Sequence, residues 1–273
     1  IGDRVFHNWS KDGEGMINVV DAIKRSCNTW FYQAGLQTGA AAIMGMAERL
    51  GFGQATGLPI AGEAKGFVPS DAFYMQRYGH KIHPGILASI CIGQVVEASP
   101  IQVCQAMCGV ADGTNLPKAR LVKQVQDFND NVVQAWSPDV RRRIELQPAA
   151  RDTVVKGMIA VVNADRGTGH NAQVEGIEVA GKTGTAQKNS GGSYFDDRHT
   201  AVFGGVVPAT QPRLAAVVVI DDPAGNLYYG GDVAAPVFSA VVGGALRLMG
   251  VAPDGAAGPA SDPLTGVTTV VRR

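Results

Sequence analysis

The sequence predicts an α+β fold, in which helices come first and an antiparallel sheet with one packing helix follows. Three observations support this prediction. Apolar residues recur at helical spacing in several stretches before Asn163. From Glu178 onward the pattern changes to short β-branched or alternating segments separated by Gly, Asn, Asp and Pro. A last apolar stretch returns to helical spacing, so the order of elements favours a layered α+β domain over a parallel α/β sheet.

Several helix starts are marked by local signals. Asn18 precedes a run in which apolar residues fall at helical spacing, and Asp21 suits the positive end of that helix. At Ser99 a capping residue is followed by Pro100, which is favoured in the first turn. The other predicted helices cover Ala40 to Leu50, a stretch that starts near Pro148 and contains Val162, and about Pro236 to Met249.

Three strands joined by hairpin connections are predicted next to one another, followed by the last helix. Beyond that helix, Asp254 to Leu264 is rich in Gly, Ala and Pro and has little to bury, which predicts a disordered tail. We therefore expect one domain over residues 1–253 and a tail over 254–273. The predicted strands are Glu178 to Gln187, Thr200 to Val207 and Leu214 to Ile220.

The composition argues against several classes of partner. Lys plus Arg and Asp plus Glu each number 24 in 273 residues, so no overall field favours nucleic acid or an anionic membrane. The apolar stretch Val233 to Leu246 is shorter than the roughly 20 residues needed to span a bilayer, and we predict a buried helix there. The four cysteines lack zinc-type spacing, and Cys104 and Cys108 share one apolar helix face, so we predict buried thiols rather than a disulfide framework.

His80 and His83 are the candidate residues for a metal site. The two rings are three positions apart, which suits one face of a helix. Pro84 and the glycines around them favour a loop instead, and no third ligand is evident. We predict no metal and no cofactor.

The segment Lys182-Thr183-Gly184-Thr185 combines a cation, two hydroxyls and a glycine inside a predicted strand. Gly184 weakens a strand interior, which suggests that a substrate lies close to the backbone there. Lys182 can hold an anion, and the threonines can hydrogen-bond a carboxylate. A polar edge strand with a bulge explains the same residues without a function. A phosphate loop is not favoured, because it requires these residues between a strand and a helix, and the residues on both sides of Gly181 are strand-like.

A second candidate motif is Ser26-Cys27-Asn28. On a regular helix Ser26 and Asn28 point to nearly opposite sides, at about 200° from one another. If both serve one site, the helix has to break there, and Asn28 or Ser26 then caps a new helix. The alternative is one continuous helix with a polar stripe.

Together the two motifs resemble those of the class B penicillin-binding proteins, the monofunctional peptidoglycan transpeptidases. In that family Ser-x-x-Lys, Ser-x-Asn and Lys-Thr-Gly occur in this order. The resemblance covers roughly Val5 to Asp254. It implies the penicillin-binding and β-lactamase-like transpeptidase fold, an antiparallel sheet flanked by helices, here incomplete at the N-terminus. Further matching segments are Phe6-His7-Asn8-Trp9, Ile92-Gly93-Gln94, Ser99-Pro100-Ile101-Gln102, Gly167-Thr168-Gly169, and Tyr228-Tyr229-Gly230-Gly231 leading to Ala235-Pro236-Val237-Phe238.

The resemblance implies a role for each motif residue. In the family a serine attacks the D-Ala-D-Ala carbonyl of a stem peptide, forms an acyl-enzyme and passes the acyl group to an amine. Ser26 is then expected to relay protons, Asn28 to bind the substrate backbone, and Lys182 to set the positive field and contact Ser26. Thr183 and Thr185 are expected to receive the terminal carboxylate, and the N–H of Thr185 to supply half of an oxyanion hole.

The expected partners and location follow from the same resemblance. We expect peptidoglycan stem peptides and β-lactam antibiotics as ligands, membrane-embedded cell-wall synthesis proteins as partners, and no nucleic acid. The expected location is the extracytoplasmic or periplasmic face of the membrane, with an anchor in an N-terminal segment absent from this sequence.

The match departs from the family at the nucleophile. No serine in the sequence is followed three positions later by a lysine. We expect the attacking serine, the central helix and two strands of the sheet to lie upstream of Ile1, and we predict that the isolated chain is not acylated by penicillin. Three alternatives remain open at this point: a D,D-carboxypeptidase or β-lactamase of the same fold, a non-catalytic β-lactam sensor, or a cell-wall scaffold.

Overall fold

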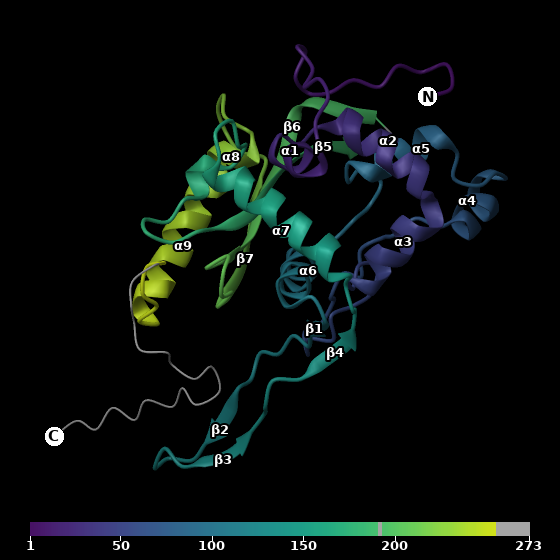
Figure 1. Cartoon of the computed structure of the whole chain (residues 1–273). Helices are drawn as coiled ribbons and strands as arrows, with labels where there is room; N and C mark the ends of the chain where they lie inside the picture. The colour runs from purple at the N-terminus through teal and green to yellow at the C-terminus, as the bar shows by residue number, and fades with distance from the viewer. Residues whose placement is uncertain (191–192, 255–273) are drawn as a thin grey trace.

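The computed structural model describes residues 1–190 and 193–254. Helices and a three-stranded sheet occupy its body, and a narrow two-stranded ribbon projects from one side (Figure 1). The helices are α1 Val19–Lys24, α2 Asn28–Thr38, α3 Ala40–Arg49, α4 Asp71–Tyr78, α5 Pro84–Cys91, α6 Pro100–Asp112, α7 Pro148–Asn163, a 3₁₀ turn at His170–Ala172, α8 Gly230–Val233 and α9 Ala235–Leu248. The strands are β1 Asn115–Pro117, β2 Gln124–Gln126, β3 Val132–Ala135, β4 Val140–Arg143, β5 Ala180–Ser190, β6 Ser193–Val207 and β7 Leu214–Asp221.

The main sheet is the antiparallel meander β5-β6-β7, which confirms the predicted α+β class. Alternate residues of β6 face opposite layers, as the period of a strand requires. On one face Phe203 is fully buried against Phe238 of α9, with ring centroids 4.8 Å apart. On the other face a Cβ at Gly204 would lie 3.1 Å from the end of Met107 on α6. The sheet is therefore the middle layer between α9 and α6.

The predicted helix after Asn18 is two helices. Asn18 caps α1 by accepting from the Asp21 N–H, as expected. The chain then turns at Ser26, and Cys27 is the extended residue that precedes α2. The prediction that Ser26 or Asn28 caps the second helix is wrong, because Cys27 occupies that position and Asn28 is already helical.

Local capping signals predicted the start of α6 correctly. Ser99 and Gln102 form a capping box, in which the Ser99 hydroxyl accepts from the Gln102 N–H and the Gln102 amide oxygen accepts from the Ser99 N–H. The predicted buried stripe needs a correction. Gln102, Gln105, Ala106 and Gly109 are the buried residues of α6, whereas Cys104 and Cys108 are half-buried. Of the four thiols, only Cys27 is fully buried.

The ribbon was not predicted from the sequence. β1 pairs with β4 and β2 pairs with β3, each with an irregular register. All four residues of β3 are exposed, so no alternation of apolar and polar residues marks it. Helices α4 and α5 were also missed, although the loop that joins them carries His80 and His83, as expected. No group of three metal-ligating side chains is present in the described ranges.

The C-terminal elements cover the sheet. By length and composition alone, the helical stretch Gly230–Leu248 could cross a membrane. It packs instead through Ala235, Phe238 and Leu246, which are buried in the core with Phe203. The backbone N–H of Asp254 donates to the Gly176 carbonyl over 2.7 Å. Residues 255–273 of the predicted tail lie outside the described residues, and the domain boundary stays a prediction.

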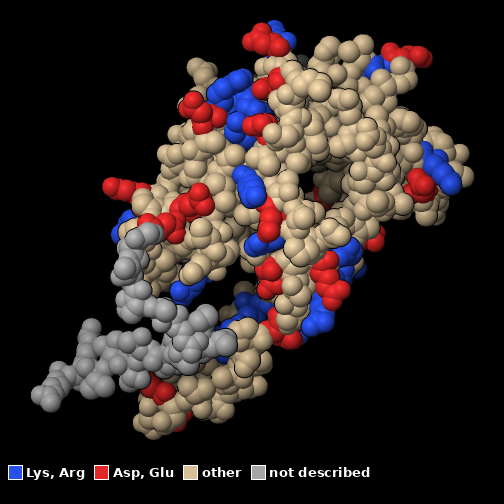
Figure 2. All heavy atoms as spheres, in the orientation of Figure 1, with Lys and Arg blue, Asp and Glu red and all other residues tan. Residues whose placement is uncertain are grey.

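Charges of both signs are scattered over the face shown in Figure 2, with no extended patch of one sign. This distribution fits the equal numbers of acidic and basic residues in the chain. The same view shows an opening in the body of the molecule, in the region between α7 and α2–α3.

Candidate active site

The site lies where the turn between α1 and α2 meets strand β5. The Lys182 ammonium donates a hydrogen bond to the Ser26 hydroxyl. These residues are 156 positions apart in the chain, so the contact depends on the packing of α1 against α7 and of α7 against β5. The structure thus brings together the two motifs that were predicted to share one site.

The turn at Ser26 settles how that motif is presented. Ser26 has a φ of 50°, in the left-handed region that non-glycine residues rarely adopt. The N–H groups of Ser26 and Cys27 donate back to Ile23 and Ala22 of α1, which closes the helix end. The continuous-helix alternative is therefore wrong. The Cys27 side chain is buried, while Ser26 and Asn28 are half-buried.

Lys182 is the electrostatic centre of the site. Its ammonium also donates to the Thr183 carbonyl over 3.0 Å and lies 3.3 Å from the Thr183 hydroxyl. Burial lowers the pKa of Lys182 to about 8, because removal from solvent disfavours the charged ammonium. A lysine with this pKa is about nine-tenths protonated at pH 7. The site therefore presents a partly desolvated cation beside two hydroxyl groups.

The two threonines of the motif have different partners. The Thr183 hydroxyl lies 3.0 Å from the Thr168 hydroxyl and accepts from Lys182. The Thr185 hydroxyl accepts from the Gly230 N–H over 3.0 Å, which leaves its own O–H free to turn toward a ligand. Thr185 is also exposed, whereas Thr183 is half-buried.

Thr168 and Gly230 belong to the site although neither was assigned a role from the sequence. Thr168 connects Thr183 to the end of α1, where its hydroxyl lies 3.5 Å from the Lys24 carbonyl. The backbone at Gly230 packs so closely against strands β5 and β6 that a side chain would clash. A Cβ there would lie 2.2 Å from the Val202 carbonyl oxygen and 2.4 Å from the Gly184 carbonyl oxygen. Both lie in segments that matched the family resemblance, which was the available signal.

Gly184 and the open edge of β5 give the site room for a ligand. In the part of the chain that is described, β5 pairs only with β6, so its other edge is unpaired. A Cβ at Gly184 would meet only Val202, at an ordinary 3.6 Å. The protein itself therefore does not require a glycine at this position.

Asn28 is the predicted site residue with the weakest link to the others. Its backbone N–H donates to the side-chain amide oxygen of Asn8 over 3.0 Å rather than to a residue of the site. Among the described hydrogen bonds, none joins the Asn28 side chain to Ser26 or Lys182. Its predicted contact with a substrate backbone stays a prediction.

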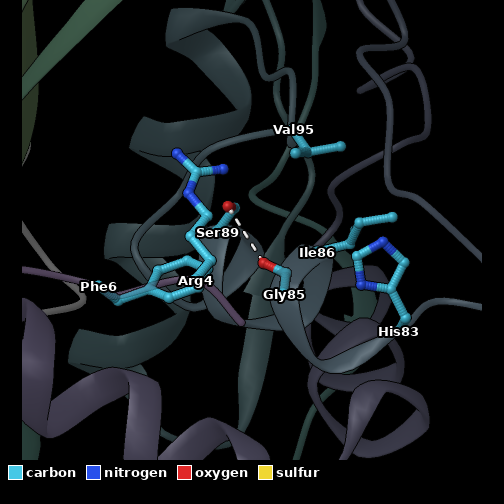
Figure 3. Close-up of a pocket in the computed structure, with 7 residues that line it drawn as sticks. All are labelled: Arg4, Phe6, His83, Gly85, Ile86, Ser89 and Val95. Carbon is cyan, nitrogen blue, oxygen red and sulfur yellow. Dashed lines mark hydrogen bonds between the residues drawn. The ribbon is translucent and has the colours of Figure 1, made fainter. Parts of the chain in front are cut away.

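A cavity of about 340 Å³ lies apart from these residues, between α5 and the N-terminal segment (Figure 3). Ser89 donates to the Gly85 carbonyl in its wall, and the Arg4 guanidinium lies 5.3 Å from the centre of the Phe6 ring. None of the predicted site residues lines it. The lining residues are Arg4, Phe6, His83, Gly85, Ile86, Ser89 and Val95.

Comparisons with known proteins agree with this arrangement. The family model described as the penicillin binding protein transpeptidase domain matches residues 1–243. Stage V sporulation protein D of Bacillus subtilis is 32% identical over 90% of the chain and 36% of its own length. The peptidoglycan D,D-transpeptidase FtsI of Escherichia coli is 30% identical over 87% of the chain and 37% of its own length.

A solved structure gives the same result for the fold. Penicillin-binding protein 3 of Mycobacterium tuberculosis, complexed with ampicillin, matches with a TM-score of 0.77 and 27% identity. The match covers 93% of this chain and 56% of that one. The chain thus spans little more than a third of the length of the two curated relatives.

Proposed function

The chain belongs to the penicillin-binding protein transpeptidase family, and on that premise we propose that it forms the substrate-receiving part of a D,D-transpeptidase site. The observation that carries the proposal is the contact of the Lys182 ammonium with the Ser26 hydroxyl, beside Thr183 and Thr185 on an open strand edge. The proposed substrates are peptidoglycan stem peptides ending in D-Ala-D-Ala.

The proposed reaction has two acyl-transfer steps. A serine oxygen attacks the carbonyl between the two D-Ala residues, the C–N bond breaks, and D-Ala leaves with the proton that the serine loses. The amine of a second stem peptide then attacks the ester, forms an amide, and returns a proton to the serine. Neither step needs a cofactor, and Ser26 next to Lys182 is suited to pass the proton to the leaving nitrogen.

Lys182 and Thr185 are proposed to bind the terminal carboxylate. A cation in a poorly hydrated site attracts an anion more strongly than one in water. The Thr185 hydroxyl already accepts from Gly230, so it donates outward to the carboxylate. Gly184 lets the substrate backbone approach the open edge of β5, which supports an extended substrate added beside the strand.

The proposal assigns the attacking serine to residues outside this sequence. No serine of the 273 residues has a lysine three positions later, and Ser26, in contact with Lys182, is proposed as the proton relay instead. β-Lactams are the proposed inhibitors, in line with the ampicillin complex of the Mycobacterium tuberculosis relative. We also propose an extracytoplasmic location, where peptidoglycan is cross-linked, and membrane-embedded cell-wall synthesis proteins as partners.

Fluorescent penicillin tests the proposal. We expect the product of the complete reading frame to become covalently labelled, with unlabelled penicillin competing for the same site, and the isolated 273 residues to stay unlabelled. Lys182→Ala in the complete product should slow labelling by about 100-fold or more, the scale seen for loss of a preorganised electrostatic group. An unlabelled complete product, or saturable labelling of the isolated chain, would overturn the proposal.

The hydrolase alternatives are separated by product analysis. A transpeptidase given a stem-peptide donor and an acceptor amine releases D-Ala and forms the cross-linked amide. A D,D-carboxypeptidase releases D-Ala equally well without an acceptor, and a β-lactamase releases hydrolysed penicillin in many turnovers. A sensor or scaffold forms none of these products.

A further inference from the structure

We propose that Asn8, Trp9 and Glu14 are positioning residues that hold Ser26 in its left-handed backbone conformation, with the hydroxyl on Lys182. We call these three residues the clamp. The inference rests on the proposed function, since Ser26 is taken to act in acyl transfer. It adds residues that touch neither the substrate nor the reacting atoms.

Ser26 needs such support because its backbone is strained. A non-glycine residue in the left-handed region costs about 1–2 kcal/mol, and strain of this kind persists only where surrounding contacts fix it. If Ser26 relaxed to a helical φ, α1 would continue toward Cys27 and the hydroxyl would turn away from β5. The contacts on the two sides of Ser26 oppose that change.

Trp9 holds the residue before Ser26. Its indole N–H donates to the Arg25 carbonyl over 2.9 Å, so the peptide group that leads into Ser26 is fixed. The Trp9 ring also lies under the Arg25 guanidinium, 5.3 Å from its centre to the guanidinium carbon. Trp9 therefore contacts both the backbone and the side chain of Arg25.

Glu14 fixes the same arginine from the other end. The Arg25 guanidinium donates to both carboxylate oxygens through Nε at 3.1 Å and through a terminal nitrogen at 2.9 Å. The Glu14 side chain is only 4% exposed, and Arg166 lies 3.5 Å from it. Arg25 also donates to the Arg166 carbonyl over 2.7 Å, in the loop that leads to Thr168. A buried, forked ion pair of this kind is far more restrictive than an exposed one.

Asn8 holds the residues after Ser26. Cys27 precedes α2 without offering a side-chain cap, and the side-chain amide oxygen of Asn8 accepts from the Asn28 N–H instead, over 3.0 Å. Asn8 thus caps a helix that starts 20 positions later in the chain. Its amide nitrogen is buried without a hydrogen-bond partner among the described residues. An aspartate would keep the acceptor, remove the unpaired donor and suit the helix dipole.

The clamp therefore fixes the peptide on each side of one strained residue. The three side chains lie within one short segment that precedes α1, and each reaches a group next to Ser26. Loosening this segment should let Ser26 turn away and let water reach the Lys182 ammonium. Both effects can be measured separately.

The first test is the rate of acylation by fluorescent penicillin in the product of the complete reading frame. We expect Trp9→Phe, which keeps an aromatic ring but removes the indole N–H, to lower the acylation rate about fivefold to tenfold, and Asn8→Leu about tenfold, the cost of one hydrogen bond. Asn8→Asp should stay within about threefold of the parent. Trp136→Phe, on the exposed ribbon, is the matched control and should not change the rate. Thermal melts exclude global unfolding as the cause.

The second test does not depend on activity. Competitive acetylation over a range of pH, read by peptide mass spectrometry, reports the pKa of the Lys182 amine. We expect Trp9→Phe and Asn8→Leu to raise that pKa toward the ordinary lysine value, and Asn8→Asp and Trp136→Phe to leave it unchanged. Loss of stability alone would not move it while the protein remains folded.

The two tests separate the inference from the proposed function. If the complete product is never acylated, the proposed function fails, and the acetylation series still judges the clamp. If acylation occurs and Trp9→Phe and Asn8→Leu match the parent in both rate and Lys182 pKa, the clamp is wrong. Equal losses in Asn8→Asp and Asn8→Leu would likewise contradict the capping role of Asn8.

Discussion

At the scale of single residues, Lys182 joins the two motifs of the site through one charge. Burial lowers its pKa to about 8. The ammonium therefore loses its proton, and with it the positive charge that would bind a carboxylate, only slightly above physiological pH. The cation is therefore both more attractive to an anion and easier to titrate than an exposed lysine.

The acylation rate of the complete product should fall as the pH rises through about 8. Above the Lys182 pKa the amine is neutral and no longer attracts the penicillin carboxylate, so the second-order rate constant should drop up to tenfold per pH unit. Lys182→Arg keeps its charge and should remove this alkaline limb, even if its absolute rate is lower. The measurement is labelling with fluorescent penicillin from pH 6 to 10. A rate that climbs through this range would instead show that the neutral amine acts as a base.

Val95 offers a residue-scale prediction about stability. It has a φ of 72°, although its branched side chain disfavours the left-handed region. Val95→Gly should relieve backbone strain in the folded state, and this gain should exceed the cost of the greater conformational entropy of glycine in the unfolded chain. The protein should therefore become more stable by about 0.5–1 kcal/mol. Val122, which is exposed and does not have a positive φ, is the matched control. The measurement is the melting temperature of each variant, and Val122→Gly should not melt at a higher temperature than the parent protein. A melting temperature of Val95→Gly at or below that of the parent would contradict the strain argument.

At the scale of elements, α6 is joined to a long loop through one buried side chain. The Gln102 amide donates to the carbonyls of Gln54 and Lys65 over 2.9 and 2.8 Å and accepts from Ser99 over 2.8 Å. Gln102 is 1% exposed, so its own amide group depends on these protein partners for hydrogen bonds. The capping box of α6 thus also holds residues that are far away in the chain.

Gln102→Leu should destabilise the protein by about 2–4 kcal/mol. The substitution nearly keeps the volume but leaves the half-buried carbonyls and N–H that Gln102 contacts without this partner, and each lost bond carries a cost. Gln37→Leu is the matched control, because Gln37 is exposed on α2. Urea unfolding followed by circular dichroism measures the difference between the two variants. Equal midpoints would show that Gln102 contributes no more than a surface glutamine.

At the scale of the whole molecule, the chain exposes more surface than its mass predicts. The accessible area is 16,898 Å², against about 11,000 Å² for a compact protein of 28.5 kDa. Even full exposure of residues 255–273 could account for only about 2,600 Å² of the difference. The opening in Figure 2 and the unpaired outer edge of β7 within the described sheet are two places where this surface lies.

The isolated 273-residue chain should therefore aggregate or unfold without cooperativity. An unpaired strand edge and uncovered apolar surface both favour association with other copies. Light scattering with size-exclusion chromatography, together with a thermal melt, compares it with the product of the complete reading frame. A monomeric chain that melts in one sharp transition would contradict this prediction.

The sequence by itself determined the order and type of the elements that have strong local patterns. The change of period near Glu178 predicted the β5-β6-β7 meander, and Ser99 with Pro100 predicted the start of α6. It also singled out Lys182, because a cation, two hydroxyls and a glycine are unusual together in a strand, and Ser26, because its motif resembles that of the family. These signals lie within a few neighbouring residues, so no tertiary contact is needed to recognise them.

Only the tertiary structure decided how those residues meet. The helix breaks at Ser26 because contacts from Trp9 and Asn8 oppose its continuation, and Thr168 reaches Thr183 across 15 positions. The ribbon of β1 to β4 was missed because its strands are only three or four residues long, β3 is entirely exposed, and both pairs have an irregular register. Each of these features depends on partners that are distant in the chain, which a local periodicity does not contain.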